Sequence, residues 1–257
     1  MTESIIIDLV DRMPEFPSEA EYLELFELVK PIAIKGIPLA QIVMATLYEW
    51  GFGVLEDTEK AKDWYTKAAE LGFVEAQYLL GELYFKEYDK KVAAKWIKKA
   101  AKQDHAKAQY KLSYIYNYGH GVRKDSKKAI KWCRKAAEQG YVPAQVDLGH
   151  QYVYGVSLSK DLSKAAEWYT KAAKQGDAEA QWSLGELYEG GWGVEQDYPR
   201  AYSLFNAAAK NGDDECVRLR DQLEEKMSTD QITEAKVLEP IWQIHQGKIC
   251  CGRTPHE

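Results

Sequence analysis

The stretch that decides the fold is YEGGWGVEQD, residues 188–197, in which three glycines fall within four residues around one tryptophan. A glycine-rich loop ahead of a helix can bind phosphate through its backbone N–H groups. Such a loop can equally be a turn whose glycines supply positive φ angles. The two readings differ in how often the pattern should occur in one chain.

The same loop occurs three more times, as YEWGFGVLED (48–57), YNYGHGVRKD (116–125) and YVYGVSLSKD (152–161). All four fit Tyr-x-x-Gly-x-Gly/Ser-Val/Leu-x-x-Asp. Four nucleotide sites of one pattern are implausible, and no strand-like segment precedes the loops, as a Rossmann or P-loop site requires. We therefore predict that the loops are turns between helices.

The loops belong to a longer repeat. Segments that begin with Ala-Gln start at Ala40, Ala76, Ala108, Ala144 and Ala180, in steps of 36, 32, 36 and 36 residues. Self-similarity at such a period indicates a repeat architecture. Apolar residues before each loop, and again after it, follow the i, i+3, i+4 spacing of one helix face. Each unit is thus predicted to be a helical hairpin in an all-α fold.

Three sets of small or polar residues fit this hairpin. Aspartates at the end of each loop suit an N-cap or first-turn role: Asp57, Asp125, Asp161 and Asp197. Glycines after second helices suit a left-handed C-terminal cap: Gly72, Gly140 and Gly176. One equivalent position in the first helices is always small, which lets paired helices approach closely: Ala45, Gly81, Ser113, Gly149 and Gly185.

The unit AQWSLGELYEGGWGVEQDYPRAYSLFNAAAKNG (180–212) and its siblings resemble the Sel-one-like repeat (SLR) family, which is related to tetratricopeptide repeats. The resemblance covers about residues 40–215. It implies an α-solenoid of antiparallel helical hairpins in a right-handed superhelix that scaffolds protein complexes, with no cofactor and no catalysis. The second unit departs from the pattern, because YFKEYDKKVAAKW (84–96) lacks four loop residues and both loop glycines.

The resulting domain prediction has four parts. Residues 1–39 form an N-terminal helical cap, with residues 3–13 as the partner of a second-type helix. Five repeats follow at 40–75, 76–107, 108–143, 144–179 and 180–215. Residues 216–246 form a C-terminal capping hairpin, in which Ser228 and Gln231 fit a capping box. Residues 247–257 are expected to be a flexible tail.

The sequence carries little that indicates catalysis. It has no HExxH, CxxC or GxSxG motif, so we expect no catalytic, cofactor-binding or metal-binding residues. The four cysteines show no disulfide framework, and Cys133 and Cys216 occupy core positions of the repeat. The start of the chain does not resemble a secretory signal, and no segment is long enough to span a bilayer. A cytoplasmic, bacterial protein is the resulting expectation.

Charge argues against a nucleic-acid partner. The chain has 34 basic and 40 acidic residues, which gives a net charge of −6, and no basic block stands out. We expect instead a protein or peptide partner in a concave groove lined by the first helices, with the protein a monomer or weak homodimer. The candidate partner-binding residues are Tyr78, Phe85, Tyr110, Tyr114, Tyr118, His150, Tyr154 and Trp182, with Glu82 and Glu186.

Several alternatives remain at this point. The rings of Tyr78, Tyr110 and Trp182 have an equal claim to be packing residues between repeats. Within the scaffold class, the chain suits an immunity protein that binds a secreted toxin, of type VI secretion for example. An alternative from a different class is a hydrolase whose active site contains His150, Tyr114 and Glu186. A third alternative is a structural protein that assembles into an oligomer.

Overall fold

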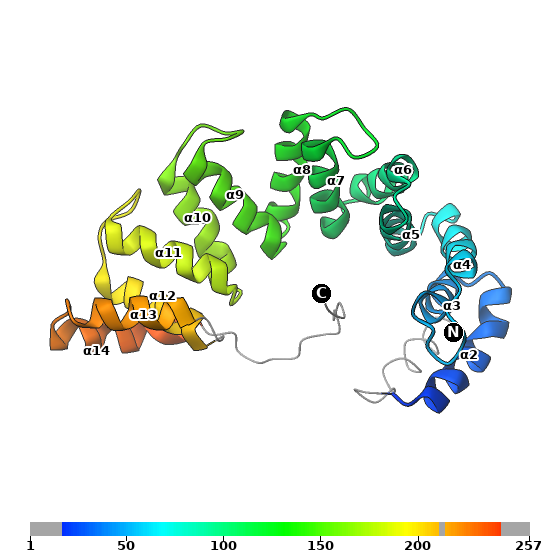
Figure 1. Cartoon of the computed structure of the whole chain (residues 1–257), viewed down its shortest axis with the longest axis horizontal. Coiled ribbons are helices and arrows are strands. Elements are labelled where there is room, and N and C mark those ends of the chain that lie inside the picture. Colours follow the sequence, from blue (N-terminus) through cyan, green and yellow to red (C-terminus); the bar gives the residue numbers. More distant parts are fainter. Residues whose placement is uncertain (1–16, 211–213, 243–257) are drawn as a thin grey trace. The chain divides into compact units, whose positions relative to one another are not determined.

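A computed structural model describes residues 17–210 and 214–242, and this part of the chain consists of α-helices and turns without a β-strand (Figure 1). It divides into two compact units, Met1–Trp132 and Cys133–Glu257. The predicted residues 3–13 and 247–257 lie outside the described part of the chain.

The first unit contains α2 (Glu19–Ile34), α3 (Pro38–Trp50), α4 (Thr58–Glu70), α5 (Val74–Lys86), α6 (Lys90–Lys102) and α7 (Ala106–Tyr118). The division between the units falls inside α8 (Ser126–Glu138). The second unit contains α9 (Val142–Tyr154), α10 (Leu162–Ala173), α11 (Ala178–Gly190), α12 (Tyr198–Lys210), α13 (Asp214–Glu224), α14 (Thr229–Leu238) and the 3₁₀ turn η1 (Glu239–Trp242).

Successive helices pack against each other from α2 to α7 in the first unit and from α9 to α13 in the second, and Figure 1 shows these successive pairs. The predicted all-α array of helical hairpins is therefore confirmed. Small residues permit the close packing inside each hairpin. A Cβ atom on Gly149 would lie 2.3 Å from the Tyr169 ring, and one on Gly185 would lie 2.5 Å from the Phe205 ring. Larger side chains at these positions would force the two helices apart.

The four recurrent loops are turns, as predicted. One backbone hydrogen bond closes each loop, because the N–H of the last motif residue donates to the carbonyl of the first tyrosine; for Asp125 and Tyr116 the distance is 2.9 Å. The glycines at the fourth and sixth positions of these loops have φ angles between 65° and 76°. The same aspartates cap the following helices: the Asp57 carboxylate accepts from the Lys60 N–H at 3.0 Å, and the other three behave alike.

The three glycines predicted to cap second helices adopt the left-handed backbone conformation. Gly72, Gly140 and Gly176 have φ angles of 91°, 89° and 82°. The second repeat has Asp104 in this slot, and it also adopts a positive φ, of 59°. The geometry of the turn therefore sets the backbone conformation even where the sequence offers no glycine. In the shortened loop of the same repeat, Tyr88 takes the left-handed conformation with φ of 67°.

The glutamine of each Ala-Gln pair is buried and joins one repeat to the one before it. Its Nε2 donates to the carbonyl eight residues earlier, in the last turn of the preceding second helix. The five pairs are Gln41 with Ala33, Gln77 with Ala69, Gln109 with Ala101, Gln145 with Ala137 and Gln181 with Ala173, at 3.0–3.4 Å. These bonds satisfy carbonyls that a helix end otherwise leaves unpaired.

The C-terminal elements lie on the fifth repeat. Helices α13 and α14 both pack against α12. The capping box of Ser228 and Gln231 is present at the start of α14, as predicted. The Trp242 indole donates to the Ser203 hydroxyl at 3.0 Å, and the Trp242 carbonyl accepts from Gln181. These contacts cover the end of the hydrophobic core in this unit.

Candidate functional site: an aromatic cluster and a pocket

Helix α7 presents an aromatic stripe to solvent in the first unit. Tyr110, Tyr114 and Tyr118 follow one another at a spacing of four, which places them on one helix face. Tyr110 is half-buried, whereas Tyr114 is 42% exposed and Tyr118 is 60% exposed. The exposed part of the stripe is therefore at the C-terminal end of the helix.

Four rings gather at that end into what we call the aromatic cluster, formed by Phe85, Tyr114, Tyr118 and His120. The Phe85 ring lies 6.2 Å from Tyr114 and 5.5 Å from His120, both nearly edge to face. Tyr114 lies 4.6 Å from Tyr118, and His120 stacks on Tyr118 at 5.8 Å. Aromatic pairs at these distances are mutually attractive. Three of the predicted binding residues thus meet in space.

Lysines border this cluster. The Lys90 Nζ lies 3.4 Å from the centre of the Phe85 ring, and the Lys111 Nζ lies 4.1 Å from it. Lys111 also forms an ion pair with Glu82 at 3.0 Å. Because this pair compensates the charge of Glu82, the carboxylate has a partner inside the chain before any other protein binds.

Two other predicted aromatic residues, Tyr78 and Trp182, pack partly against the hydrophobic core. Tyr78 is half-buried against the core that includes Leu112 and Ile115, and its ring lies 4.9 Å from His105. Trp182 is half-buried against Phe205 in the second unit. The packing role that the sequence allowed for the first-row aromatics is therefore seen in both.

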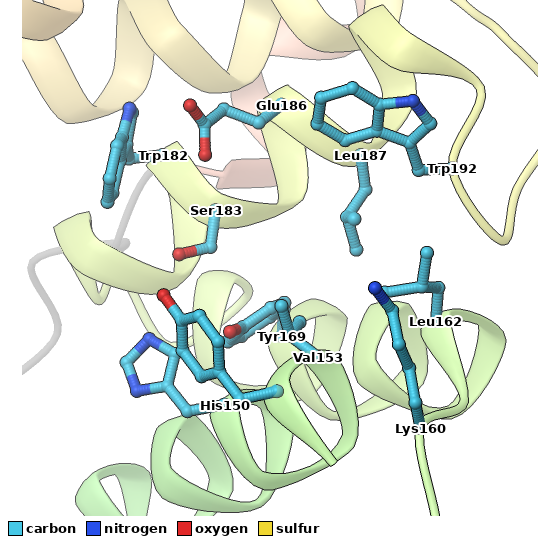
Figure 2. A pocket seen from close by; sticks show the side chains of 11 residues that line it. His150, Val153, Lys160, Leu162, Tyr169, Trp182, Ser183, Glu186, Leu187 and Trp192 are labelled. Carbon is cyan, nitrogen blue, oxygen red and sulfur yellow. The ribbon is translucent and has the colours of Figure 1, made fainter.

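The second unit contains a pocket of about 430 Å³ between α9 and α11 (Figure 2). Four of the predicted residues line it: His150, Tyr154, Trp182 and Glu186. Tyr154 is 72% exposed at its mouth. A volume of this size suits a small ligand or one long side chain.

Glu186 is the acidic group of this pocket. Burial raises the pKa of its carboxyl above the usual value, and the carboxylates of Glu189 and Glu215 raise it further. No hydrogen bond or ion pair joins Glu186 to another group of the described residues. Glu189, three residues later on α11, pairs with Lys226 at 3.1 Å. Glu186 and Glu189 therefore differ in whether a cation of this chain is already present.

His150 lies beside one carboxylate and two tyrosine rings. Its Nε2 lies 3.5 Å from the Glu179 Oε1, and its ring lies 5.6 Å from Tyr169 and 6.1 Å from Tyr154. The hydrolase alternative combines His150 and Glu186 with Tyr114, which belongs to the other compact unit. The structure therefore brings only two of these three residues to one pocket.

Among the residues of these sites that sequence reasoning missed, His120 and Trp192 share one position of the repeat. Both occupy the position between the two glycines of the recurrent loop, as Phe52 does in the first repeat. Phe52 stacks on Tyr22 at 4.6 Å, His120 joins the aromatic cluster, and Trp192 lines the pocket. The four loops together could have revealed this position, because it carries a ring between two glycines in three of them, and Val156 between Gly155 and Ser157 in the fourth.

The cysteines that the structure describes are core residues, as predicted. Cys133 and Cys216 are buried, and desolvation raises the pKa of the Cys133 thiol to about 12. Such a thiol is protonated at neutral pH and is a poor nucleophile. Cys250 and Cys251 lie outside the described residues.

No cluster of three His, Cys, Asp or Glu side chains among the described residues is arranged to hold a metal ion. No helix among these residues is both long and apolar enough to cross a membrane.

Stacked helical hairpins with a shared loop and a buried Ala-Gln pair define an α-helical repeat protein of the solenoid class. The sequence profile of the Sel1 repeat family matches residues 38–73, 74–105, 106–141, 142–177 and 178–213. The chain belongs to the Sel1 repeat family. Members of this family are protein-interaction scaffolds, and the fold is typically non-catalytic.

Solved structures agree with this assignment. A Sel1 repeat protein from Oxalobacter formigenes is 36% identical with a TM-score of 0.70, and the match covers 77% of this chain and 84% of that chain. An immunity protein from Pseudomonas aeruginosa has the same fold at 21% identity, with a TM-score of 0.53 and coverage of 81% of both chains. A comparison with curated proteins found no match.

Proposed function

We propose that this chain is an interaction scaffold whose first unit binds a protein or peptide partner through the aromatic cluster. The observation that carries the proposal is the gathering of Phe85, Tyr114, Tyr118 and His120 at one exposed site. Tyrosine rings bury a large area at a low cost in conformational entropy, and they are enriched among the residues that dominate binding energy.

Exposure supports the same proposal. Tyr114 and Tyr118 keep much of their surface in water, although Tyr114 contacts three other rings and Tyr118 contacts two. Contiguous aromatic surface of this kind is characteristic of interaction sites. Because Glu82 is already paired with Lys111, we do not assign it a role in attracting a basic partner to this cluster.

A photo-crosslinking experiment tests the proposal. The chain would carry p-benzoylphenylalanine in place of Tyr118, and irradiation in the native cell extract would attach the partner covalently. The same amino acid in place of Tyr88, which is 83% exposed outside the cluster, is the control. A protein crosslinked from position 118 and absent from position 88 is the expected result.

Affinity for that partner then measures the contribution of the cluster. Tyr114→Ala with Tyr118→Ala should weaken binding by about 30-fold or more, because a residue that dominates an interface contributes about 2 kcal/mol. Leu55→Ala with Leu71→Ala removes exposed apolar surface elsewhere in the first unit and should leave the affinity unchanged. Equal affinity for both double variants, with native circular dichroism, would contradict the proposal.

The immunity alternative has less support from this chain. The Pseudomonas aeruginosa immunity protein is 21% identical, a level at which the likeness concerns the fold. Identification of the crosslinked partner decides the matter, since a toxin would be recognised by its own activity and by its inhibition on binding.

A further inference from the structure

The pocket of the second unit differs from the aromatic cluster in its charge and depth. Figure 2 shows the Glu186 carboxylate directed toward Trp182, with Trp192 on the opposite side of Glu186 and Leu187. His150 and Ser183 lie on the side of Trp182. The pocket thus has one end with a carboxylate beside an indole and another end with an indole beside leucine side chains.

Four tryptophans outside the pocket have a lysine ammonium group over the indole ring. Trp64, Trp96 and Trp168 lie on second helices, and in each case the lysine three residues later places its Nζ 3.8 Å from the ring centre. Trp50 has Lys86 at 4.8 Å. A cation over an indole face is therefore a recurrent interaction in this fold.

The two tryptophans of the pocket have no such cation among the described residues. The buried Trp182 Nε1 also has no hydrogen-bond partner there. The same pocket contains Glu186, a half-buried carboxylate without an ion pair within the described chain. A carboxylate in a partly apolar site is destabilised until a cation approaches it.

We infer that this pocket receives an arginine side chain of the protein partner, with its guanidinium paired to Glu186 and stacked on Trp182. A guanidinium is planar and weakly hydrated, so it can stack on a ring and pair with a carboxylate at the same time. An ammonium group is more strongly hydrated and offers no flat face. The aliphatic stem of arginine suits the apolar wall formed by Val153 and Leu187.

Lys160 determines which end of the pocket takes the cation. It lines the pocket, and Figure 2 shows it on the side of Leu162, away from the Glu186 carboxylate. Its ammonium group would repel a second cation at that end. The other charged or titratable groups around the pocket are His150, Tyr154 and Tyr169, with Glu179 beside His150 and with Glu189 and Glu215 near Glu186. Glu189 pairs with Lys226, and Glu215 pairs with Arg218.

This inference rests on the proposed function only for the claim that the arginine belongs to a protein. A direct test uses the full chain and the peptide acetyl-Gly-Arg-Gly-amide, followed by NMR through the indole N–H signals of Trp182 and Trp192. Matched peptides contain citrulline, which has the shape of arginine without its charge, or lysine. We expect saturable shifts of both indoles with the arginine peptide, and at least tenfold weaker binding of the citrulline and lysine peptides.

Two variants that should change the affinity in opposite directions complete the test. Glu186→Gln should reduce affinity for the arginine peptide by about tenfold or more, and Lys160→Gln should increase it by about two- to threefold, because the repulsion is removed. Glu167→Gln changes the net charge equally on an exposed position of α10 and should have no effect. Equal binding of arginine and citrulline, equal binding of arginine and lysine, or an unchanged affinity of Glu186→Gln would each overturn the inference.

The two proposals fail in different ways. Loss of crosslinking from position 118 concerns the aromatic cluster of the first unit and leaves the peptide titration untouched. Absence of saturable indole shifts removes the arginine pocket while the aromatic cluster keeps its own test.

Discussion

Gly121 lies so close to Lys90 that a Cβ atom on the glycine would stand 2.0 Å from the Lys90 carbonyl oxygen. Gly53 and Gly193, the equivalent second glycines of their loops, approach Tyr22 and Leu162 in the same manner. In each case the loop of one repeat rests on the backbone at or near the start of an earlier second helix. The second loop glycine is therefore a contact between repeats as well as a turn residue.

We expect Gly121→Ala to destabilise the protein by about 3 kcal/mol, because it adds a backbone clash to the strain of a positive φ angle. Gly119→Ala is the matched control. Gly119 has a φ of 76°, but its nearest contacts to an added Cβ are 3.4 Å. It should cost about 1 kcal/mol, from φ strain alone. Urea unfolding monitored by circular dichroism measures both, and equal losses would refute the interpretation.

The buried glutamines should contribute through the carbonyl groups that they satisfy. Gln77 donates to the Ala69 carbonyl at 3.0 Å and accepts from Gln103 at 2.9 Å. We expect Gln77→Leu to cost about 2 kcal/mol, since a buried carbonyl loses its partner. The exposed Gln103→Ala should cost less than about 1 kcal/mol. The midpoint of urea unfolding measures the difference, and a Gln77→Leu variant as stable as the wild type would show that the bond adds nothing.

Acid should weaken the N-caps. Hydrogen bonds lower the pKa of three capping carboxyls: the largest contribution comes from a backbone N–H at Asp57 and Asp125, and from a lysine side chain at Asp161. A lowered pKa in the folded state means that the stabilisation is present above the unfolded pKa of about 4 and is lost as the pH falls through the folded pKa. The protein should therefore lose these contributions below about pH 4.

Replacement of the three aspartates by asparagine isolates this effect. Asparagine keeps the capping oxygen but does not titrate, so the melting temperature of the triple variant should fall less between pH 5 and pH 3. Glu24→Gln, Glu70→Gln and Glu138→Gln remove three exposed helical carboxylates as the control. If the control flattens the acid decline as much as the asparagine variant does, capping is not its cause.

The repeat architecture could be predicted from the sequence because its determinants are local. The period, the positive φ of the loop glycines and the aspartate caps each depend on residues within a few positions of one another. The position that follows each second helix shows how strong this local requirement is. Asp104 adopts the left-handed conformation there, although the second repeat lacks a glycine.

The candidate sites were predictable only in part. Phe85, Tyr114 and Tyr118 were expected on a common surface, but His120, which contacts all three, was not. From the sequence, Glu82 and Glu186 were both predicted to contact a partner. Glu82 is paired with Lys111, 29 residues away, whereas Glu186 has no ion-pair partner among the described residues, because Lys160 lies at the other end of the pocket.

The sequence by itself determined the hairpins, their turns and their caps, because backbone conformation and helix-end hydrogen bonds are set by neighbouring residues. Only the tertiary structure decided which rings meet and which charges are compensated. These contacts join residues about one repeat apart, such as Phe85 with Tyr114 or His150 with Glu179. The offset between stacked helices, which a repeat period does not specify, brings them together.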